Sequence, residues 1–184
     1  VDEAHSFGVV GENGLGACNK HNVTDDVDII MGTFSKVCGC IGGFIAASEE
    51  VIDWYFWLAR AHVFTVSIPP STAAAMLTSL KILQEQPEIV RTLQSNIRHF
   101  VHGFRSLGAN LRVDHESAVI PIVIGDERKI EVISGALMDA GVQVVPIVYP
   151  AVSRNGARFR FTVTASHSIS DIDYVISVFE NAMK

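Results

Sequence analysis

The sequence lacks the features that mark secreted, metal-bound and membrane-spanning proteins. Its 184 residues include three cysteines, Cys18, Cys38 and Cys40, an odd number whose spacing predicts neither a disulfide framework nor a cysteine metal site. We therefore expect reduced thiols in a cytoplasmic protein, and no bound metal. The apolar runs are short, as in AVIPIVIG (118–125), against the ~20 residues that a membrane-spanning helix needs, so we expect no transmembrane segment.

Clusters of positive charge are missing as well. The sequence has 14 lysine and arginine residues against 20 aspartate and glutamate residues, a net charge of −6, and the basic residues are scattered. Proteins that bind nucleic acid draw affinity from a basic surface facing the phosphates, and no such surface is expected here. What the sequence does contain is 48% apolar and 18% charged residues, a globular composition with enough length for a core.

Apolar segments of two kinds alternate along the chain and predict an α/β protein. Short runs that end in small residues predict strands at 27–33, 42–48, 62–67, 118–125, 142–147 and 157–165. Apolar residues at three- and four-residue steps, with capping residues, predict helices at 49–60, 70–85, 87–107, 128–140 and 169–183. We expect the tail of a larger α/β domain at residues 1–75, connecting helices at 76–108 and a small α/β domain at 109–184.

Residues 2–5 spell Asp-Glu-Ala-His, a motif with two chemical interpretations. In a helicase it binds magnesium and hydrolyses ATP, which also requires a phosphate-binding loop and basic patches. In other proteins an aspartate and a histidine at this spacing, here Asp2 and His5, hold an organic cofactor at a strand end. The scattered basic residues disfavour the helicase, and Glu3, which would matter most to an ATPase, is left without a chemical role. Because the sequence begins at Val1 inside this motif, without a methionine, we expect the C-terminal part of a longer polypeptide.

The stretch DIIMGTFSKVCGCIGG (28–43) carries the residue on which the choice depends. A strand is expected to end at Gly32, and Lys36 follows in a turn of small residues, where glycines let the backbone approach a bound group closely. With almost no acid nearby in sequence to pair it, Lys36 is a candidate for a Schiff base with a carbonyl compound. The alternative is a solvated loop lysine.

Together these residues supply what a pyridoxal phosphate (PLP) site requires. PLP needs a carboxylate at its pyridine nitrogen, a hydrogen-bonding group at its ring oxygen, a lysine for the imine and hydroxyls for its phosphate. Asp2, His5 and Lys36 fill the first three roles. The hydroxyl groups of Thr33 and Ser35 fill the last.

Four motifs resemble, in order, the signatures of the α-oxoamine synthase family: VDEAHSFGVVGENGLG, GTFSK followed by GG, FTVSIPP and RFRFTVTASHS. The family includes serine palmitoyltransferase, 8-amino-7-oxononanoate synthase and glycine C-acetyltransferase. The resemblance runs through nearly the whole chain and implies a fold-type I PLP-dependent transferase, with the aspartate aminotransferase-like α/β fold. It further implies a homodimer that condenses a small amino acid with an acyl-CoA thioester and releases carbon dioxide. The family's N-terminal half has no counterpart in these residues.

The same resemblance implies roles for single residues around the cofactor. Lys36 is expected to carry PLP and to remove the Cα proton of the amino acid. Asp2 is expected to face the pyridinium nitrogen and His5 the ring oxygen, both as catalytic groups that also bind the cofactor. Thr33 and Ser35 are expected to contact the phosphate.

Two further motifs imply contacts with the neighbouring subunit and with the substrate. In FTVSIPP, Thr65 and the backbone at Val66 are expected to reach the phosphate in the other subunit. In RFRFTVTA, a period of two places Arg158 and Arg160 on one face of a strand. Arg160, seven residues before the histidine of ASHS, is expected to bind the substrate carboxylate through a bidentate guanidinium. His167, that histidine, is given a structural role.

Departures from the family pattern at Leu15, Val37 and Val66 leave the amino acid and the acyl chain open. Two other functions share part of the evidence. Another fold-type I enzyme, such as an aminotransferase, would keep the aspartate and the lysine. A non-catalytic partner subunit would lack the lysine, which Lys36 argues against. Since the upstream half of the site is expected outside this sequence, we predict that the isolated chain binds PLP poorly, and tight binding would refute this.

Overall fold

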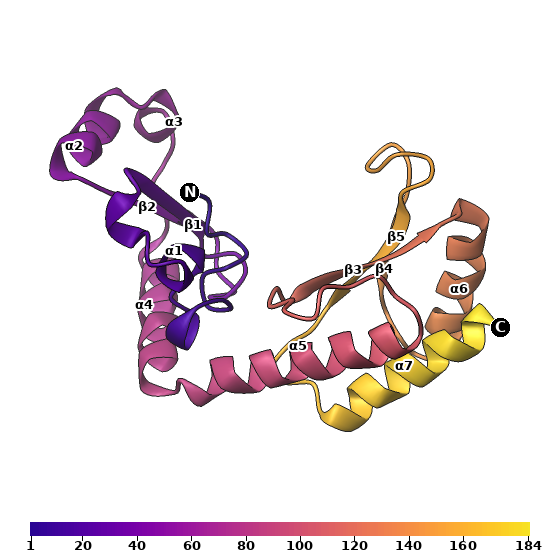
Figure 1. Ribbon diagram of the computed structural model, residues 1–184. Coiled ribbons are helices and arrows are strands. Elements are labelled where there is room, and N and C mark those ends of the chain that lie inside the picture. The colour runs from indigo at the N-terminus through magenta and orange to yellow at the C-terminus, as the bar shows by residue number, and fades with distance from the viewer. The chain divides into compact units, whose positions relative to one another are not determined.

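The computed structural model describes all residues from 1 to 184 and divides them into two compact units, Val1–Val90 and Arg91–Lys184, here called unit 1 and unit 2. Figure 1 traces the elements of each unit. The division falls inside the region 76–108, for which connecting helices are predicted. The assignment of residues 1–75 to a larger domain and of residues 109–184 to a small domain stays a prediction.

Unit 1 contains a two-stranded antiparallel sheet at the first two predicted strand positions (Figure 1). β1 (Ile29–Thr33) pairs with β2 (Gly43–Ala47), and the register runs from Ile29 opposite Ala47 to Thr33 opposite Gly43. The N-terminal residues run beside β1, through an isolated parallel bridge between Asp2 and Met31. Three single turns of helix lie between this bridge and β1: η1 (Glu12–Gly14), α1 (Ala17–Lys20) and η2 (Thr24–Asp26).

Three helices follow β2: α2 (Glu49–Leu58), α3 (Arg60–Val63) and α4 (Pro70–Glu85). The helix predicted at 70–85 is confirmed, with Pro70 in its first turn, where a missing N–H breaks no helical hydrogen bond. The helix predicted at 49–60 is interrupted at Ala59, whose backbone is extended with φ −72° and ψ 106°.

The strand predicted at 62–67 is wrong. The N–H of Val63 donates to the carbonyl of Ala59 at 3.0 Å and the N–H of Phe64 to that of Arg60 at 3.1 Å, so the segment begins as a helical turn. Residues 66–69 after it form no regular element. β-Branched and aromatic residues favour a strand only where another strand pairs with them, and neither sheet includes this segment.

Unit 2 is a three-stranded antiparallel sheet covered by helices. Its strands are β3 (Val119–Gly125), β4 (Val145–Ile147) and β5 (Ala157–Thr162), in the order β3-β5-β4. Its helices are α6 (Glu127–Asp139), α7 (Ile169–Met183) and most of α5 (Glu88–Ser106). Each element predicted in this region exists, although β4 is shorter than the strand predicted at 142–147.

Side-chain caps explain where α6 and α7 begin. The Asp126 carboxylate accepts hydrogen bonds from the backbone N–H groups of Arg128 at 2.8 Å and Lys129 at 3.3 Å. At α7 the predicted capping box is present: the Ser168 hydroxyl accepts from the N–H of Asp171 at 3.1 Å, and Asp171 accepts from the N–H of Ser168 at 2.8 Å. These bonds satisfy N–H groups that a helix leaves unpaired at its N-terminus.

The sheet of unit 2 has one buried and one exposed face, as the period of two predicts. Phe159 and Phe161 of β5 are buried, while Arg160 between them is exposed. On the buried side, Phe104 of α5 packs on Phe161 with ring centroids 5.2 Å apart, and Phe179 of α7 packs on Phe159 at 6.0 Å. The helices therefore cover one face only (Figure 1), and the face that carries Arg160 is open.

Candidate active site

Lys36 lies in the turn after β1, whose backbone is closed by hydrogen bonds, and its side chain is exposed to solvent. The N–H of Phe34 donates to the carbonyl of Gly42 at 2.9 Å, and that of Gly39 donates to the carbonyl of Lys36 itself at 3.2 Å. Gly43 is required where the turn closes, because a Cβ there would lie 2.7 Å from the carbonyl oxygen of Gly32. The small residues thus hold the turn tight, while the lysine side chain is exposed.

Two hydroxyl groups lie together at the entrance of this turn. Thr33 Oγ1 and Ser35 Oγ are 2.8 Å apart, and Thr33 Oγ1 also accepts from the Ser35 N–H at 3.2 Å. A further bond from Thr33 Oγ1 to the carbonyl of Gly42, at 3.2 Å, fixes the pair at the end of β1. The structure therefore brings the predicted phosphate-binding hydroxyls together, next to Lys36 in the chain.

The Asp-Glu-Ala-His segment lies along β1. The Glu3 N–H donates to the carbonyl of Met31 at 2.7 Å, and the Met31 N–H donates to the carbonyl of Val1 at 2.9 Å. Asp2 Oδ1 accepts from the N–H of Ala4 at 2.7 Å, which fixes the aspartate carboxylate, and both Asp2 and His5 are exposed. The bridge at Met31 places Asp2 two residues from Thr33, at the end of the strand that leads to Lys36.

The loop that follows His5 packs against the lysine turn. A Cβ at Gly8 would lie 2.2 Å from Val37 Cγ2, so only glycine permits this contact with the residue after Lys36. Phe7 packs edge-on against Phe44 of β2, with ring centroids 5.6 Å apart. Asp2, His5, Thr33, Ser35 and Lys36 therefore all belong to one packed region of unit 1.

Glu3, for which the sequence indicates no role, is the most buried charged residue of this region, with 2% of its surface exposed. Its carboxylate accepts hydrogen bonds from the Ser6 hydroxyl and from the backbone N–H groups of Ala17 at 2.8 Å and Cys18 at 2.7 Å. Burial raises the pKa of the Glu3 carboxyl, but these hydrogen bonds outweigh burial and hold the pKa below its ordinary value. No sequence signal would have revealed these bonds, because the donors lie in irregular backbone 14 and 15 residues away.

In the segment FTVSIPP, the two residues predicted to reach the neighbouring subunit are exposed to solvent. Thr65 and Val66 are both exposed, Val66 to 92%, and the Thr65 hydroxyl donates to the carbonyl of Ala61 in the preceding helix, α3. A Cβ at Gly42 would lie 3.2 Å from Ile68, so the end of the segment contacts the lysine turn. Neither Thr65 nor Val66 forms a hydrogen bond with the hydroxyl groups of Thr33 and Ser35 in the same chain.

Arg160 belongs to unit 2, where it lines a cavity of about 360 Å³. Its other lining residues come from both faces of β5 and from the helices, and include Thr162, His167, Phe161, Phe100 of α5 and Ile172 of α7. Arg158 points to the same face, but its Nε donates to the carbonyl of Gly156 at 2.8 Å, which ties it to the preceding turn. Arg160 is therefore the more accessible of the two arginines, and its role as the substrate-binding arginine stays a prediction.

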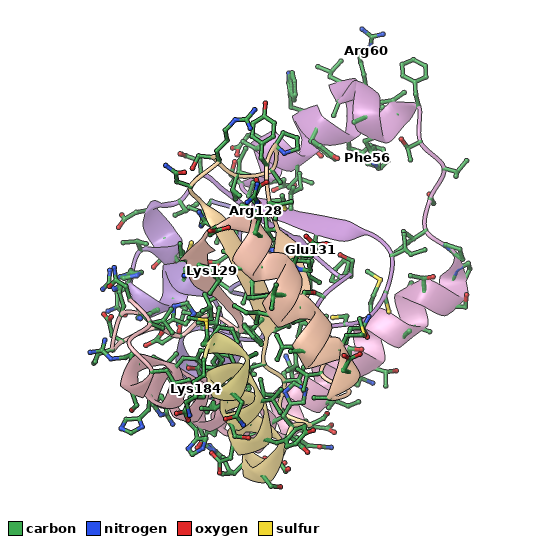
Figure 2. All side chains as sticks on the ribbon, turned by 90° about the vertical axis from the view of Figure 1, so that its right-hand side faces the viewer. Phe56, Arg60, Arg128, Lys129, Glu131 and Lys184 are labelled. Atoms are coloured by element: carbon green, nitrogen blue, oxygen red, sulfur yellow. The ribbon has the colours of Figure 1, made fainter.

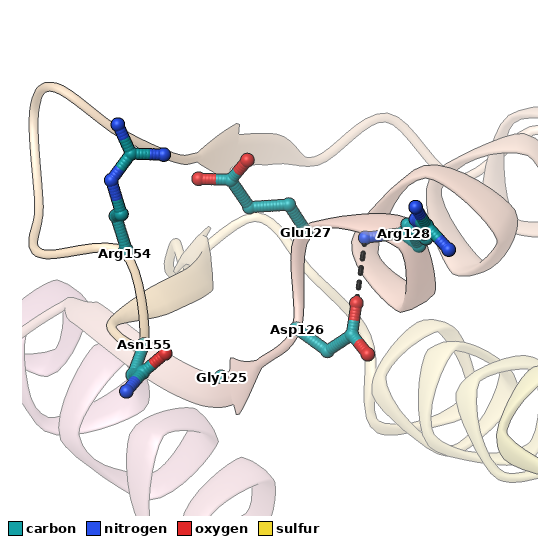
Figure 3. A pocket seen from close by; sticks show the side chains of 6 residues that line it. All are labelled: Gly125, Asp126, Glu127, Arg128, Arg154 and Asn155. Carbon is teal, nitrogen blue, oxygen red and sulfur yellow. Dashed lines mark hydrogen bonds between the residues drawn. The ribbon is translucent and has the colours of Figure 1, made fainter.

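A second cavity of unit 2, of about 470 Å³, contains none of the predicted site residues (Figure 3). It lies at the N-terminus of α6 and is lined by Gly125, Asp126, Glu127, Arg128, Arg154 and Asn155. In Figure 3 the Asp126 carboxylate bonds to the backbone of Arg128, which is the helix cap already described. This cavity is polar surface around a cap, and it carries no group that reacts with a carbonyl compound.

The chemistry of the donor set in unit 1 fits a phosphorylated aromatic aldehyde. An exposed amine follows two hydroxyl groups that hydrogen-bond to each other, and an oriented carboxylate lies on the neighbouring backbone. An amine can form an imine with the aldehyde, and the hydroxyls can donate to a phosphate.

None of the helices of the chain is both long enough and apolar enough to pass through a bilayer.

Comparison with known proteins supports the same reading of the motifs. The sequence matches the family described as aminotransferase class I and II over residues 1–179. An 8-amino-7-oxononanoate synthase of Petrotoga mobilis is 39% identical over 184 residues, which are 100% of this chain and 47% of that protein. A serine palmitoyltransferase of Bacteroides thetaiotaomicron is 36% identical over 184 residues, 100% of this chain and 46% of that protein. The chain thus spans about half the length of the curated relatives it matches.

The fold is shared with solved structures. One described as SPT with the PLP internal aldimine superposes with a TM-score of 0.92 at 31% identity, over 99% of this chain and 46% of that chain. The two relatives carry the names of enzymes that the four sequence motifs resemble, and the predicted α/β transferase fold is confirmed. The chain belongs to the aminotransferase class I and II family.

Proposed function

We propose that the protein is a PLP-dependent acyltransferase that condenses a small amino acid with an acyl-CoA thioester and releases carbon dioxide and the carrier thiol. The observation that carries this proposal is the Lys36 turn, with the Thr33–Ser35 hydroxyl pair, packed against the loop of Asp2 and His5. The names of the relatives support it. When bound, the pyridine ring of PLP supplies an electron sink for the carbanion at Cα of the amino acid.

The residues of unit 1 supply the binding and proton-transfer groups. Lys36 would hold the cofactor through Nζ, and, once the amino acid has displaced it from the cofactor, the freed amine would accept the Cα proton of the amino acid. Asp2 holds a proton on the pyridine nitrogen, and the turn made by its bond from Ala4 fixes the carboxylate for this contact. His5 donates to the ring oxygen. Thr33 and Ser35 bind the phosphate, and their mutual hydrogen bond pre-organises both hydroxyls.

Arg160 binds the carboxylate of the amino acid substrate. Arg160 is exposed on β5 and lines a cavity, and a guanidinium can hold a carboxylate through two parallel hydrogen bonds. The carboxylate that it holds is the one lost as carbon dioxide. Because the carboxylate is held, the amino acid has a fixed orientation about Cα. The Cα bond that is to be broken can then face the pyridine ring of PLP.

A second copy of the protein completes the site. Thr65 and the backbone at Val66 are exposed in unit 1 and reach the phosphate in the partner subunit. Helix α2 supports such burial, because it exposes large apolar side chains, Trp54 by 61% and Trp57 by 72%, and exposed apolar surface of this kind marks a site of interaction. Figure 2 shows the side chains of α2 and α3, with Phe56 and Arg60 labelled.

The reaction takes place in the cytoplasm. All three cysteines are free, and two of them are buried. Burial raises the pKa of the Cys38 thiol, which keeps it protonated and poorly reactive. Free thiols at this number and spacing are typical of a reducing compartment.

The test follows the visible absorbance of the lysine-bound cofactor in the full-length protein. Serine, alanine and glycine are offered in turn, and thiol release from an acyl-CoA is measured for each. Lys36→Ala should abolish both the absorbance of the lysine adduct and thiol release. Lys81→Ala, at an exposed lysine of α4 in the same unit, is the matched control and should change neither. An unchanged spectrum in Lys36→Ala would contradict the assignment of Lys36 as the residue that binds the cofactor.

An aminotransferase is the second candidate, because the family carries that description. It would use Asp2 and Lys36 in the same way and would not require the FTVSIPP segment. Transfer of the amino group to a keto acid, without thiol release from any acyl-CoA, would favour it. The exposed Lys36 speaks against a non-catalytic partner subunit, in which no lysine adduct would form.

A further inference from the structure

Glu3 uses every polar group it has. Its N–H donates to the carbonyl of Met31, and its own carbonyl accepts from Ser6 at 3.1 Å and from Phe7 at 2.9 Å. Its side-chain Oε1 accepts from Cys18, and Oε2 accepts from Ala17 and from the Ser6 hydroxyl. The residue thus joins three segments of backbone: β1, the start of the loop after His5, and α1.

The far end of this loop fits against the Glu3 carboxylate with no room to spare. A Cβ at Gly16 would lie 2.6 Å from Glu3 Oε2, and the loop closes on itself through the N–H of Gly16, which donates to the carbonyl of Val10 at 2.8 Å. The N–H of Gly8 likewise donates to the carbonyl of Gly14 at 2.7 Å. Residues 6–18 are therefore a closed loop whose position is set by the carboxylate.

The same loop contacts the lysine turn through Gly8 and Val37. Moving the loop would move Gly8 away from Val37 or press it against that side chain. Because Glu3 stands between Asp2 and His5 in the chain, its anchoring also fixes the backbone from which those two side chains project. One buried carboxylate therefore controls the spacing between the Asp2–His5 edge and the Lys36 turn.

We propose that Glu3 is a positioning residue, which sets the cofactor ring against Lys36 by anchoring the loop 6–18 to β1. This inference rests on the proposed PLP site. Glu3 is buried beneath the loop and does not itself touch the cofactor. Its removal is expected to change the orientation and the affinity of PLP, in addition to the stability that any buried hydrogen-bonded carboxylate contributes.

The test compares Glu3→Gln, Ser6→Ala and Asp171→Asn in the full-length protein. Glu3→Gln keeps the shape but replaces one acceptor oxygen by an NH2 group, which faces a backbone N–H. Ser6→Ala removes a single donor to the carboxylate. Asp171→Asn is the matched control, since Asp171 also accepts from a backbone N–H and a hydroxyl, both of Ser168, but in unit 2.

Three quantities are measured for each protein: the melting temperature without PLP, the dissociation constant of PLP and the visible circular dichroism per bound PLP. Glu3→Gln should raise the dissociation constant about tenfold, the loss expected for one charge-assisted hydrogen bond, and should diminish the dichroism. Ser6→Ala should move both in the same direction by less. Asp171→Asn should lower the melting temperature and leave both PLP readouts unchanged.

A purely structural Glu3 gives a different pattern: a lower melting temperature in Glu3→Gln, with the dissociation constant and the dichroism of the wild type. That result overturns the inference. If Glu3→Gln does not fold, Ser6→Ala decides, and wild-type PLP readouts in it reject the positioning role. If the wild-type protein shows no absorbance of a lysine-bound cofactor, the proposed function itself fails, and with it the inference.

Discussion

The two units of the chain are held together in different ways. All the largest fully buried side chains lie in unit 2: Ile97, Phe104, Ile120, Leu137 and Phe159. The apolar cluster of unit 1 has three buried members: Phe34, Cys38 and Met76. What unit 1 has instead is the hydrogen-bond network of Glu3 and a series of glycines that bring backbone segments close together.

This difference shows where covering surfaces are needed. Unit 2 buries its own aromatic residues between one face of a sheet and its helices, so it has the contents of a complete core. Unit 1 leaves large apolar side chains exposed on α2 and on the segment after α3. Contiguous exposed apolar surface marks a site of interaction. The unit that carries Lys36 therefore has the smaller core, and it exposes large aromatic side chains: Trp54, Phe56, Trp57 and Phe64.

The largest effect is expected when the units are separated. Residues 87–184, which include the whole of α5, should unfold cooperatively on heating, because their core is complete. Residues 1–86 should show no cooperative transition and should aggregate through α2. Far-ultraviolet circular dichroism against temperature, with light scattering, measures both. A sharp unfolding transition in 1–86 would contradict the comparison.

A smaller effect is expected from single core substitutions. Phe159→Ala removes a fully buried ring of unit 2 and should lower the free energy of unfolding by about 3–5 kcal/mol. Phe34→Ala in unit 1 should cost less, because its cluster is small and partly open. Val132→Ala, at a side chain that is 69% exposed, is the control. Urea unfolding measures all three, and equal losses for Phe34 and Phe159 would show that unit 1 has a core of comparable strength.

The smallest effect is expected in the dependence of stability on pH in the acid range. Folding lowers the pKa of Glu3 below its ordinary value of 4.5, so its stabilising contribution is complete above that pH and is lost as the pH falls through the lowered pKa. Hydrogen bonds from Ser168 lower the pKa of Asp171 in the same direction, but that carboxyl is exposed and solvent screens it. Urea unfolding of the wild type should therefore lose stability below about pH 4.5.

Variants assign this loss to a residue. Glu3→Gln should flatten the fall of stability with acid more than Asp171→Asn does. The opposite ranking would mean that the buried network of unit 1 contributes less than the exposed cap of unit 2.

The features that the sequence predicts correctly are those that depend on residues close together in the chain. The capping box of Ser168 and Asp171 lies within four residues, and α7 begins where that pattern places it. The alternation of β5 is equally local, and it places Arg160 on the exposed face. The strand predicted at 62–67 failed because pairing depends on a partner strand that composition alone does not supply.

The candidate site divides along the same line. The Lys36 turn and its hydroxyls belong to a short motif, and the structure brings the hydroxyls of Thr33 and Ser35 within 2.8 Å of each other. The packing of Gly8 on Val37 and the bonds of Glu3 connect segments of irregular backbone, for which no periodic pattern exists. The chemical roles of all the candidate site residues stay predictions: Asp2, His5, Thr33, Ser35, Lys36, Thr65, Val66 and Arg160.

The contact between Gly16 and Glu3 has a consequence for how this sequence can vary. Residue 16 has φ +105°, and any side chain added there would overlap the buried carboxylate. A shorter acid or a neutral residue at position 3 would free that space but leave the N–H groups of Ala17 and Cys18 without their acceptor. In a library that randomises both positions, the two should therefore behave as one coupled locus, and nearly all functional clones should carry the original pair.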